Sequence, residues 1–173
     1  ATWQGLLRAL DRFPIHRRDE PIIAIGGGVL TDVVAFVASS YRRGVPHIKV
    51  PTTLMGYVDA AVGVKCGINF NGYKNRLGSF EPPACVLLDR RFLTTLPLRH
   101  LHNGLCEIIK LAVIKDAHLF DLLERSGAAS LACAFQDGPG GEILDRAIGG
   151  MLEELAPNLH EAELARKVDF GHT

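Results

Sequence analysis

The segment "PIIAIGGGVLTD", residues 21–32, constrains the fold more than any other part of the chain. A short apolar run that ends in three glycines predicts a buried parallel strand over 21–28. The next residues, 30–44, read as a helix that Gly44 ends. A strand, a glycine turn and a helix in this order are typical of α/β proteins, so we expect an α/β fold with a parallel sheet.

The remaining patterns divide the chain near Pro97 into an α/β domain, 1–97, and an all-helical domain, 98–173. Strands are predicted only before this point, and the segment 65–80 reads as a long polar loop of the kind that is functional or disordered. The interval 126–142 reads as a weak helix followed by a Gly-Pro loop. The other predicted elements are helices over 3–13, 54–63, 98–114, 116–126, 141–155 and 160–168, and strands over 47–53 and 84–89.

Composition excludes several classes of function. Lys+Arg and Asp+Glu both number 19, so no basic excess favours nucleic acid, and no segment has the length or charge pattern of a membrane span or surface helix. The N-terminal residues lack the pattern of a signal peptide. Four cysteines without a CxxC pair predict buried, reduced thiols and a cytoplasmic location. The missing initiator Met and the abrupt end at "DFGHT" indicate a piece of a longer protein.

The glycine turn and the next strand end predict a shared crevice. Gly26, Gly27 and Gly28 permit close approach of a phosphate to a helix N-terminus, although three glycines also fit a plain tight turn. Thr31 or the turn itself would cap the helix. Asp32 would hydrogen-bond a ribose or simply begin the helix. Ligands of open parallel sheets bind at the carboxyl ends of strands, where Thr52 and Thr53 also stand.

A cluster of polar residues follows this crevice. Cations amid glycines suit an anionic substrate, with phosphate as the first candidate, whereas the alternative is a solvated loop. Arg42 and Arg43 stand at a helix end, where they would also complement the helix dipole. The cluster consists of Asp59, Lys65, Lys74, Asn75 and Arg76.

The helix "GLCEIIKLAVIK", residues 104–115, carries two charges three positions apart. Glu107 and Lys110 are therefore neighbours on its surface, either as a solvated ion pair or as groups aimed into a site. No histidine spacing matches a zinc motif, so spacing alone does not assign a metal to Glu107. His172, after a glycine, could be a ligand at a helix start.

Taken together, these motifs resemble the sugar phosphate cyclases, the relatives of 3-dehydroquinate synthase. The match begins near residue 20 and includes "GGGVLTDVVAFVASSYRRGVPHIKVPTTL", "KNRLGSF", "LHNGLCEIIKLAVIKD" and "VDFGHT". The resemblance implies an NAD-binding α/β domain and a helical metal-binding domain with the active site between them. It also implies NAD, a divalent metal (Zn2+ or Co2+) and a phosphorylated ketose as substrate.

The resemblance assigns roles residue by residue. Glu107 and His172 match metal ligands, and a further histidine ligand is expected beyond Thr173. Arg43 matches an arginine that reaches the site of the partner subunit, which implies a homodimer. Lys65, Asn75, Lys110 and Asp169 match substrate-binding or catalytic positions. The matching NAD contacts are Gly27, Gly28, Asp32, Thr52, Thr53, Asp59, Lys74 and Thr95.

Two departures indicate the branch of the family. Dehydroquinate synthases carry a lysine and an arginine where Met151 and Ala165 stand, so a substrate carboxylate would lack its partners. This pattern resembles cyclases of sedoheptulose 7-phosphate, and most of all the 2-epi-5-epi-valiolone synthases. Asp169 favours them over the sister desmethyl-4-deoxygadusol synthases, whereas His160 points the other way. Such enzymes combine transient NAD oxidation, β-elimination of phosphate, re-reduction and an intramolecular aldol cyclisation.

Three rival interpretations stay open at this point. The protein could be a 3-dehydroquinate synthase, or a metal-dependent polyol dehydrogenase of related fold that releases NADH. It could also be an inactive fragment with residual nucleotide binding. For the 173 residues alone we expect little or no turnover.

Overall fold

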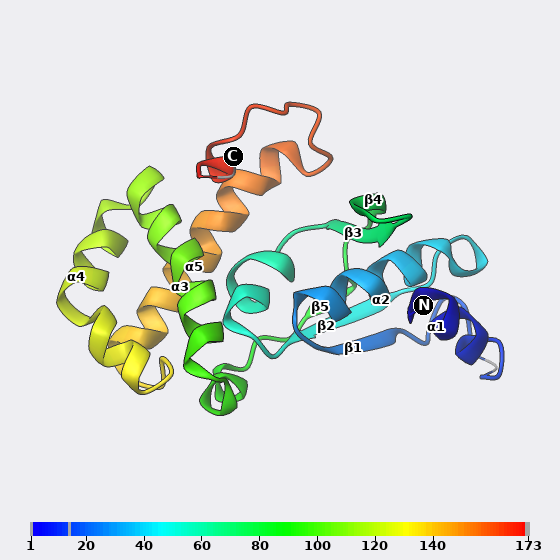
Figure 1. The fold of residues 1–173 in the computed structure, drawn as a ribbon, viewed down its shortest axis with the longest axis horizontal. Coiled ribbons are helices and arrows are strands. Elements are labelled where there is room, and N and C mark those ends of the chain that lie inside the picture. Colours follow the sequence, from blue (N-terminus) through cyan, green and yellow to red (C-terminus); the bar gives the residue numbers. More distant parts are fainter. Residues whose placement is uncertain (1, 14, 172–173) are drawn as a thin grey trace.

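The computed structural model describes residues 2–13 and 15–171. Its helices and strands follow one another in an order that places every described strand before Pro97. Figure 1 shows the two resulting parts side by side, with the α/β part at one end and the helices at the other. The division at Pro97 into two domains remains a prediction, because the core described below crosses it.

The α/β part contains the predicted parallel strand, glycine turn and helix, but the strand is not fully buried as predicted, since Ile23 and Ile25 are 57% and 58% exposed. β1 (Ile22–Gly26) and β2 (His47–Pro51) pair in parallel, and β2 also pairs in parallel with β5 (Cys85–Val86), which is much shorter than predicted. α2 (Gly28–Ser40) packs on both longer strands and continues into a 3₁₀ turn, Tyr41–Arg43. α1 (Thr2–Leu10) packs against α2.

The prediction of a polar loop over 65–80 is wrong, because this segment forms an antiparallel hairpin. β3 (Lys65–Phe70) and β4 (Tyr73–Phe80) pair across a turn in which Asn71 and Gly72 both have positive φ, 50° and 79°. An Asn-Gly pair between two strands is a strong hairpin signal because both residues tolerate this conformation. The hairpin packs on α2, which faces the buried positions of β3.

Three long helices form the second part. α3 (Leu98–Ile114) agrees with its predicted range, whereas α4 (Ala117–Ala132) and α5 (Gly138–Leu155) are longer than predicted. α4 packs against α5, and α5 begins early because the side chain of Asp137 caps it. None of the described helices has the length and apolar character that a membrane span requires.

The predicted helix over 160–168 is also wrong. Asn158 and Glu163 exchange two hydrogen bonds, and Glu161 between them has a φ of 52°, so the chain turns instead of continuing as a helix. Only a 3₁₀ turn, Lys167–Asp169, follows. This segment arches beyond α5 in Figure 1.

The main hydrophobic core joins the two parts. Leu54, Tyr57 and Val58, which follow β2, pack among residues of α3, α4 and α5. They belong to the predicted short helix after β2, which the structure shows as the π-helical turn η2 (Gly56–Ala60). The core also contains the fully buried side chains of Leu93, Ile108, Leu111, Leu119, Phe135, Ile143, Leu144 and Met151.

The cysteines are only partly as predicted. All four are free, but Cys66 alone is buried, whereas Cys85, Cys106 and Cys133 are exposed. Cys66 lies on the inner face of β3, where its Sγ is 3.1 Å from the hydroxyl of Ser79.

Candidate active site

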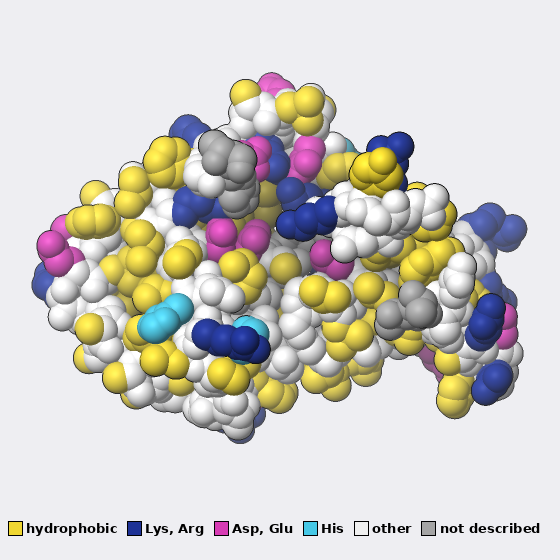
Figure 2. Space-filling view, viewed as in Figure 1, with side chains coloured by type: hydrophobic (Ala, Val, Ile, Leu, Met, Phe, Trp, Pro, Cys, Tyr) yellow, Lys and Arg dark blue, Asp and Glu magenta, His cyan; other side chains and the backbone are white. Residues whose placement is uncertain are grey.

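A cavity of about 480 Å³ lies between the α/β part and the helices; we call it the central cavity. Figure 2 shows basic and acidic side chains gathered around a hollow at this place. Its walls come from α2, η2, the hairpin, α3, α5 and the C-terminal segment. Six predicted site residues line it: Asp32, Asp59, Lys65, Asn75, Lys110 and Asp169.

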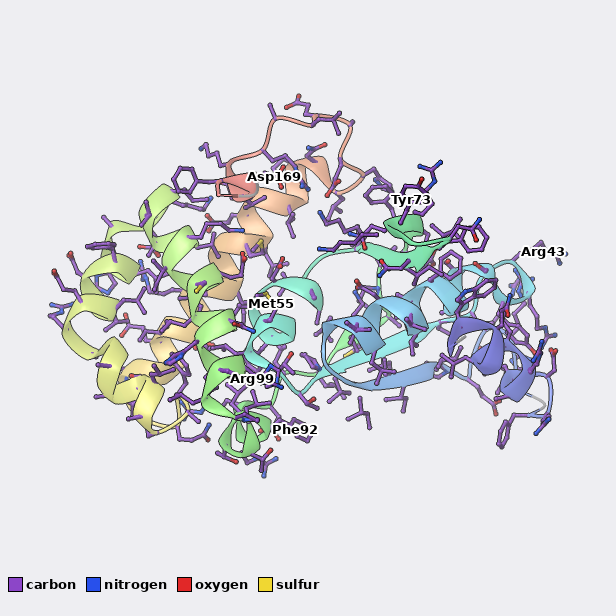
Figure 3. The ribbon with its side chains drawn as sticks, viewed as in Figure 1. Arg43, Met55, Tyr73, Phe92, Arg99 and Asp169 are labelled. Carbon is purple, nitrogen blue, oxygen red and sulfur yellow. The ribbon has the colours of Figure 1, made fainter. Side chains whose placement is uncertain are left out.

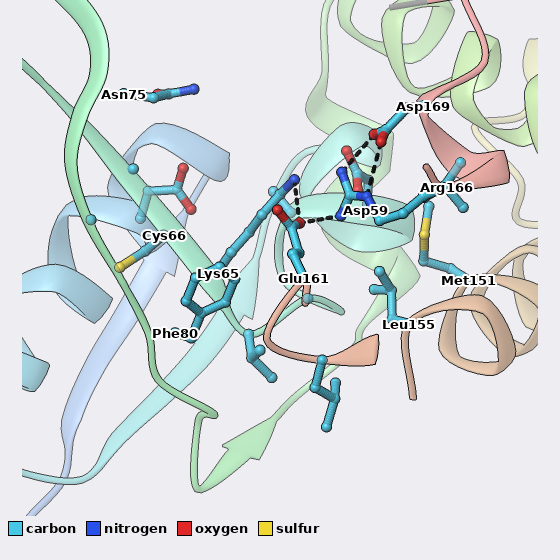
Figure 4. Close-up of a pocket in the computed structure, with 18 of the residues that line it drawn as sticks. Asp59, Lys65, Cys66, Asn75, Phe80, Met151, Leu155, Glu161, Arg166 and Asp169 are labelled. Atoms are coloured by element: carbon cyan, nitrogen blue, oxygen red, sulfur yellow. Dashed lines mark hydrogen bonds and ion pairs between the residues drawn. The ribbon is translucent and has the colours of Figure 1, made fainter. Parts of the chain in front are cut away.

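The hairpin places two of these residues. Lys65 is the first residue of β3. Asn75, on β4, lies opposite the part of β3 where the strand register shifts. Asn75 has a φ of 50°, and its backbone N–H donates to the side chain of Asn69. Figure 4 shows the Asn75 amide and the Lys65 ammonium reaching into the cavity from one side. The positions predicted on a loop are thus held on a paired hairpin.

A chain of ion pairs closes one side of the central cavity. Lys65 Nζ lies 2.9 Å from Glu161 Oε1, and Glu161 in turn pairs with Arg166. Arg166 also donates to both carboxylate oxygens of Asp169, at 2.9 and 2.6 Å. These hydrogen bonds raise the pKa of Arg166. The chain ties the C-terminal segment to the hairpin, as the dashed lines in Figure 4 show.

Sequence reasoning missed Glu161 and Arg166, which lie within the helix predicted over 160–168. The available signal was the density of charge in "HEAELARKVD", residues 160–169, where two acids are followed by two bases and a further acid. This pattern is equally typical of a solvated helix, so only the turn at Glu161 reveals that the charges face a cavity.

Glu107 and Lys110 form an ion pair on α3, and neither group is freely solvated. Their side chains are only 14% and 10% exposed. Lys110 lines the central cavity, so the face they share borders this cavity. Of the two readings of this helix, the geometry supports groups aimed towards a site.

Of the predicted metal ligands, Glu107 is the one that lies within the described residues. A largely buried carboxylate beside a cavity is a suitable zinc ligand. Among residues 2–13 and 15–171, however, no three Asp, Glu, His or Cys side chains form a set that could hold a metal. The predicted ligand His172 lies outside the described residues.

A second cavity, of about 540 Å³, borders the glycine turn; we call it the glycine cavity. Gly27, Gly28 and Thr53 line it, so the structure brings the turn and the end of β2 together as predicted. The backbone N–H of Thr52 donates to the Gly26 carbonyl at 2.9 Å, which holds the two strand ends in register.

Close packing around the turn favours glycine at two of its positions. A Cβ on Gly27 would lie 3.1 Å from the Thr53 methyl, and one on Gly28 would lie 3.1 Å from Ala60 Cβ. Gly27 itself is the N-cap of α2, without a side-chain cap. Thr31 is therefore not the cap; its hydroxyl donates to the Gly28 carbonyl. The first-turn N–H groups of α2 stand at the edge of the glycine cavity, where they suit a phosphate.

α3 contributes two residues that sequence reasoning missed. His100 and Asn103 stand one turn apart at the start of α3 and line the glycine cavity. Their spacing by three positions was the available signal, because it places both on one helix face.

Asp32 lies in the central cavity and not in the glycine cavity. Burial raises its pKa to about 6, against the opposing effects of Lys49 and of a hydrogen bond from the backbone of Gly67. The carboxylate thus connects α2 to β3 at the cavity wall.

Four predicted NAD or substrate contacts line neither cavity within the described residues. Lys74 is exposed on β4, and Thr95 donates to the Phe92 carbonyl in a 3₁₀ turn. Thr52 holds the strand ends. Arg43 is exposed, and Figure 3 shows it at the far end of the α/β part, away from Asp169. Such a position does not serve the cavity of the same chain.

Met151 and Ala165, the two departures from the dehydroquinate synthase pattern, lie in different surroundings. Met151 is 1% exposed and forms part of the central cavity wall. Ala165 is exposed, next to Arg166, which lines the cavity and already pairs with Asp169. An apolar side chain therefore occupies the wall at Met151.

Comparison with known proteins identifies the family. The family model for the N-terminal region of 3-dehydroquinate synthase matches residues 1–103. A 2-epi-5-epi-valiolone synthase from Actinoplanes sp. is 56% identical over 174 residues, which cover 97% of this chain and 44% of that protein. A demethyl-4-deoxygadusol synthase from Trichormus variabilis is 41% identical over 182 residues, covering 99% and 44%.

A solved structure agrees with this result. ValA, a 2-epi-5-epi-valiolone synthase from Streptomyces hygroscopicus subsp. jinggangensis 5008 with NAD+ and Zn2+ bound, superposes with a TM-score of 0.95 at 52% identity. The superposition covers 99% of this chain and 48% of ValA. The chain thus spans less than half the length of these relatives. On its fold, its cavities and its match over residues 1–103, the chain belongs to the 3-dehydroquinate synthase family.

Proposed function

We propose that the protein to which this chain belongs is a 2-epi-5-epi-valiolone synthase. It converts sedoheptulose 7-phosphate to 2-epi-5-epi-valiolone with loss of phosphate. The observation that carries the proposal is the composition of the central cavity. Lys65 and Lys110 offer cations to a phosphorylated sugar, whereas the wall at Met151 is apolar and offers no charge to a substrate carboxylate.

The runner-up is a demethyl-4-deoxygadusol synthase. It accounts for the same cavity, but the chain is 41% identical to such an enzyme and 56% identical to a valiolone synthase. The difference favours the valiolone synthase.

NAD is the proposed cofactor, and ValA carries it. The glycine cavity fits its pyrophosphate, because Gly27, Gly28 and Thr53 line that cavity at the N-terminus of α2. Bound NAD would supply reversible hydride removal. Asp32 and Asp59 face the central cavity, where they would contact the nicotinamide side. Further contacts from Thr52, Lys74 and Thr95 remain predictions.

A divalent metal, zinc as in ValA or cobalt, is the second proposed cofactor. Glu107 would be one ligand, His172 another, and a histidine beyond Thr173 a third. A carboxylate and two imidazoles leave a position open for substrate oxygens, as catalytic sites require.

The chain's own residues would orient the substrate and hold its charges. Lys65 and Lys110 would bind the phosphate and stabilise developing oxyanions, because both ammonium groups face the cavity. Asn75 would hydrogen-bond sugar hydroxyls. Asp169, held by Arg166, would fix the C-terminal side of the cavity.

We also propose a homodimer in the cytoplasm. Arg43 is exposed and far from the central cavity of its own chain, which suits a residue that serves a partner subunit.

The decisive experiment is identification of the product by mass spectrometry. The complete protein, with NAD and zinc or cobalt, is given either sedoheptulose 7-phosphate or the acidic sugar phosphate that dehydroquinate synthases use. We expect 2-epi-5-epi-valiolone from the first, none from the second, and no net NADH. Formation of a deoxygadusol, of dehydroquinate or of stoichiometric NADH would each identify a rival. The 173 residues alone should show little turnover.

A further inference from the structure

Lys49 is a charged side chain in the interior of the α/β part. It lies in the middle of β2 and is 0% exposed, which is rare for lysine because a buried ammonium loses its hydration. A buried charge persists where hydrogen bonds compensate it. The partners of Lys49 therefore indicate what this residue is for.

The ammonium of Lys49 holds the turn that follows η2. Its Nζ donates to the Gly63 carbonyl at 3.0 Å and to the Ala60 carbonyl at 3.4 Å. Both residues line the central cavity, and the turn leads directly into Lys65 at the start of β3. Lys49 thus holds the backbone of this turn from the side away from the cavity, and the turn positions Lys65 in the cavity wall.

Asp32 fastens the other end of the same stretch. Its carboxylate, on α2, accepts a hydrogen bond from the backbone of Gly67 and interacts electrostatically with Lys49. The segment 60–67 is therefore held by two charges of opposite sign, one from β2 and one from α2. Asp32 itself faces the cavity, whereas Lys49 does not line it.

We propose that Lys49 is a positioning residue: its buried ammonium anchors the segment 60–67 so that Lys65 faces the sugar phosphate in the central cavity. The effect on substrate rests on the proposed function, whereas the anchoring of the segment does not.

The test compares Lys49→Met with wild type in the complete protein. Methionine keeps most of the volume but removes the charge and the donor. Hydrogen exchange followed by mass spectrometry should show the peptide covering 60–67 exchanging about tenfold faster, because its anchoring is lost. The KM for sedoheptulose 7-phosphate should rise about tenfold, because Lys65 is no longer held towards the cavity.

Val37→Ala is the matched control. Val37 is 1% exposed and lies on α2, which packs on β2. Its apolar side chain forms no hydrogen bond, so it cannot anchor the segment 60–67 as Lys49 does. It should lower stability without selective exchange at 60–67 and without a change in KM. If Lys49→Met and Val37→Ala behave alike in both measurements, Lys49 is only a core residue and the proposal is wrong.

Lys49→Gln covers the case in which Lys49→Met does not fold. Its amide keeps one donor on a shorter chain, so exchange at 60–67 should be intermediate; exchange equal to wild type would contradict the proposal. If wild type makes no cyclitol, the proposed function fails, but the exchange comparison still decides whether Lys49 anchors the segment.

Discussion

The burial of Glu107 indicates a role for this residue beyond that of a surface charge. Its carboxylate is 14% exposed and pairs with Lys110, although helix surfaces usually carry solvated pairs. The pair borders the central cavity, so the energetic cost of burying it is consistent with a functional site.

Replacing Glu107 by Gln should abolish metal binding in the complete protein. Glutamine keeps the shape but not the anionic oxygen, so zinc affinity should fall by about 100-fold or more. Metal analysis after dialysis and titration calorimetry would measure this. Glu124→Gln, an exposed change on α4, is the control and should retain full zinc. Equal zinc content in the two variants would exclude Glu107 as a ligand.

His47 makes stability depend on pH. It is 1% exposed and its Nε2 has no hydrogen-bond partner among the described residues. Burial, followed by the charge of Lys49, lowers its pKa to about 4 from the ordinary value of 6.5. Because the unfolded chain takes up this proton first, the contribution of His47 to the free energy of unfolding should fall as the pH drops from 6.5 towards 4, by about 3 kcal/mol, whereas the raised pKa of Asp32 acts in the opposite direction.

Urea unfolding of wild type and His47→Gln at about pH 7 and at about pH 4.5 would isolate this contribution, because the two pH values bracket most of the titration and Asp32 titrates in both proteins. On going from the higher to the lower pH, the free energy of unfolding of wild type should fall relative to that of His47→Gln, whatever the stability of the variant at neutral pH. An identical pH dependence in the two proteins would show that other groups are responsible.

At the scale of elements, the hairpin and α3 depend on glycines for different reasons. Gly72 supplies a positive φ in the turn between β3 and β4. Gly104, inside α3, instead permits close packing: a Cβ there would lie 2.5 to 2.7 Å from atoms of Leu54. Leu54 follows β2, so Gly104 sets how closely the helical part approaches the α/β part.

Gly104→Ala should therefore destabilise the protein, against the usual preference of helices for alanine. We expect a loss of about 3 kcal/mol, because the nearest atoms include backbone that cannot yield easily. Gly149→Ala in α5 is the matched control, since a Cβ at Gly149 would meet nothing within 4 Å. That change should stabilise by up to about 1 kcal/mol. Urea unfolding distinguishes the two, and equal effects would contradict the packing argument.

At the scale of the whole molecule, the central cavity exists only because the two parts meet. The hairpin and α2 form one wall, while α3, α5 and the C-terminal segment form the others. The ion pairs from Lys65 through Glu161 to Arg166 connect these walls. Catalysis is therefore expected to be sensitive to the packing between the two parts.

The proposed dimer has its own test. Arg43→Ala and Glu107→Gln should each inactivate the enzyme, the first through the site of the partner. In a co-expressed mixture, half the dimers combine the two chains and carry one intact site. About a quarter of wild-type activity should then return. If Arg43 served its own chain, no mixture would regain activity, and purification over two different affinity tags, one on each variant, would show that mixed dimers had formed.

The sequence by itself determined the local elements whose signals lie within a few residues. The strand and glycines of "IIAIGGG", the following helix and the pair Glu107–Lys110 are examples, because burial periodicity and close packing leave a mark in neighbouring positions. The sequence also contains the Asn-Gly signal of a hairpin, but the polarity of residues 65–80 favoured the incorrect prediction of a loop. Family resemblance supplied the expected roles, which spacing alone did not.

Only the tertiary structure decided which charges share a cavity. Asp32 on α2, Lys65 on β3 and Lys110 on α3 converge through packing of distant segments. Arg43, equally polar in sequence, lines neither this cavity nor the glycine cavity. Likewise, nothing local distinguishes the buried Lys49 from exposed lysines, because burial depends on what the rest of the chain places over a strand. Contacts between residues far apart in sequence carry this information, and local patterns do not contain it.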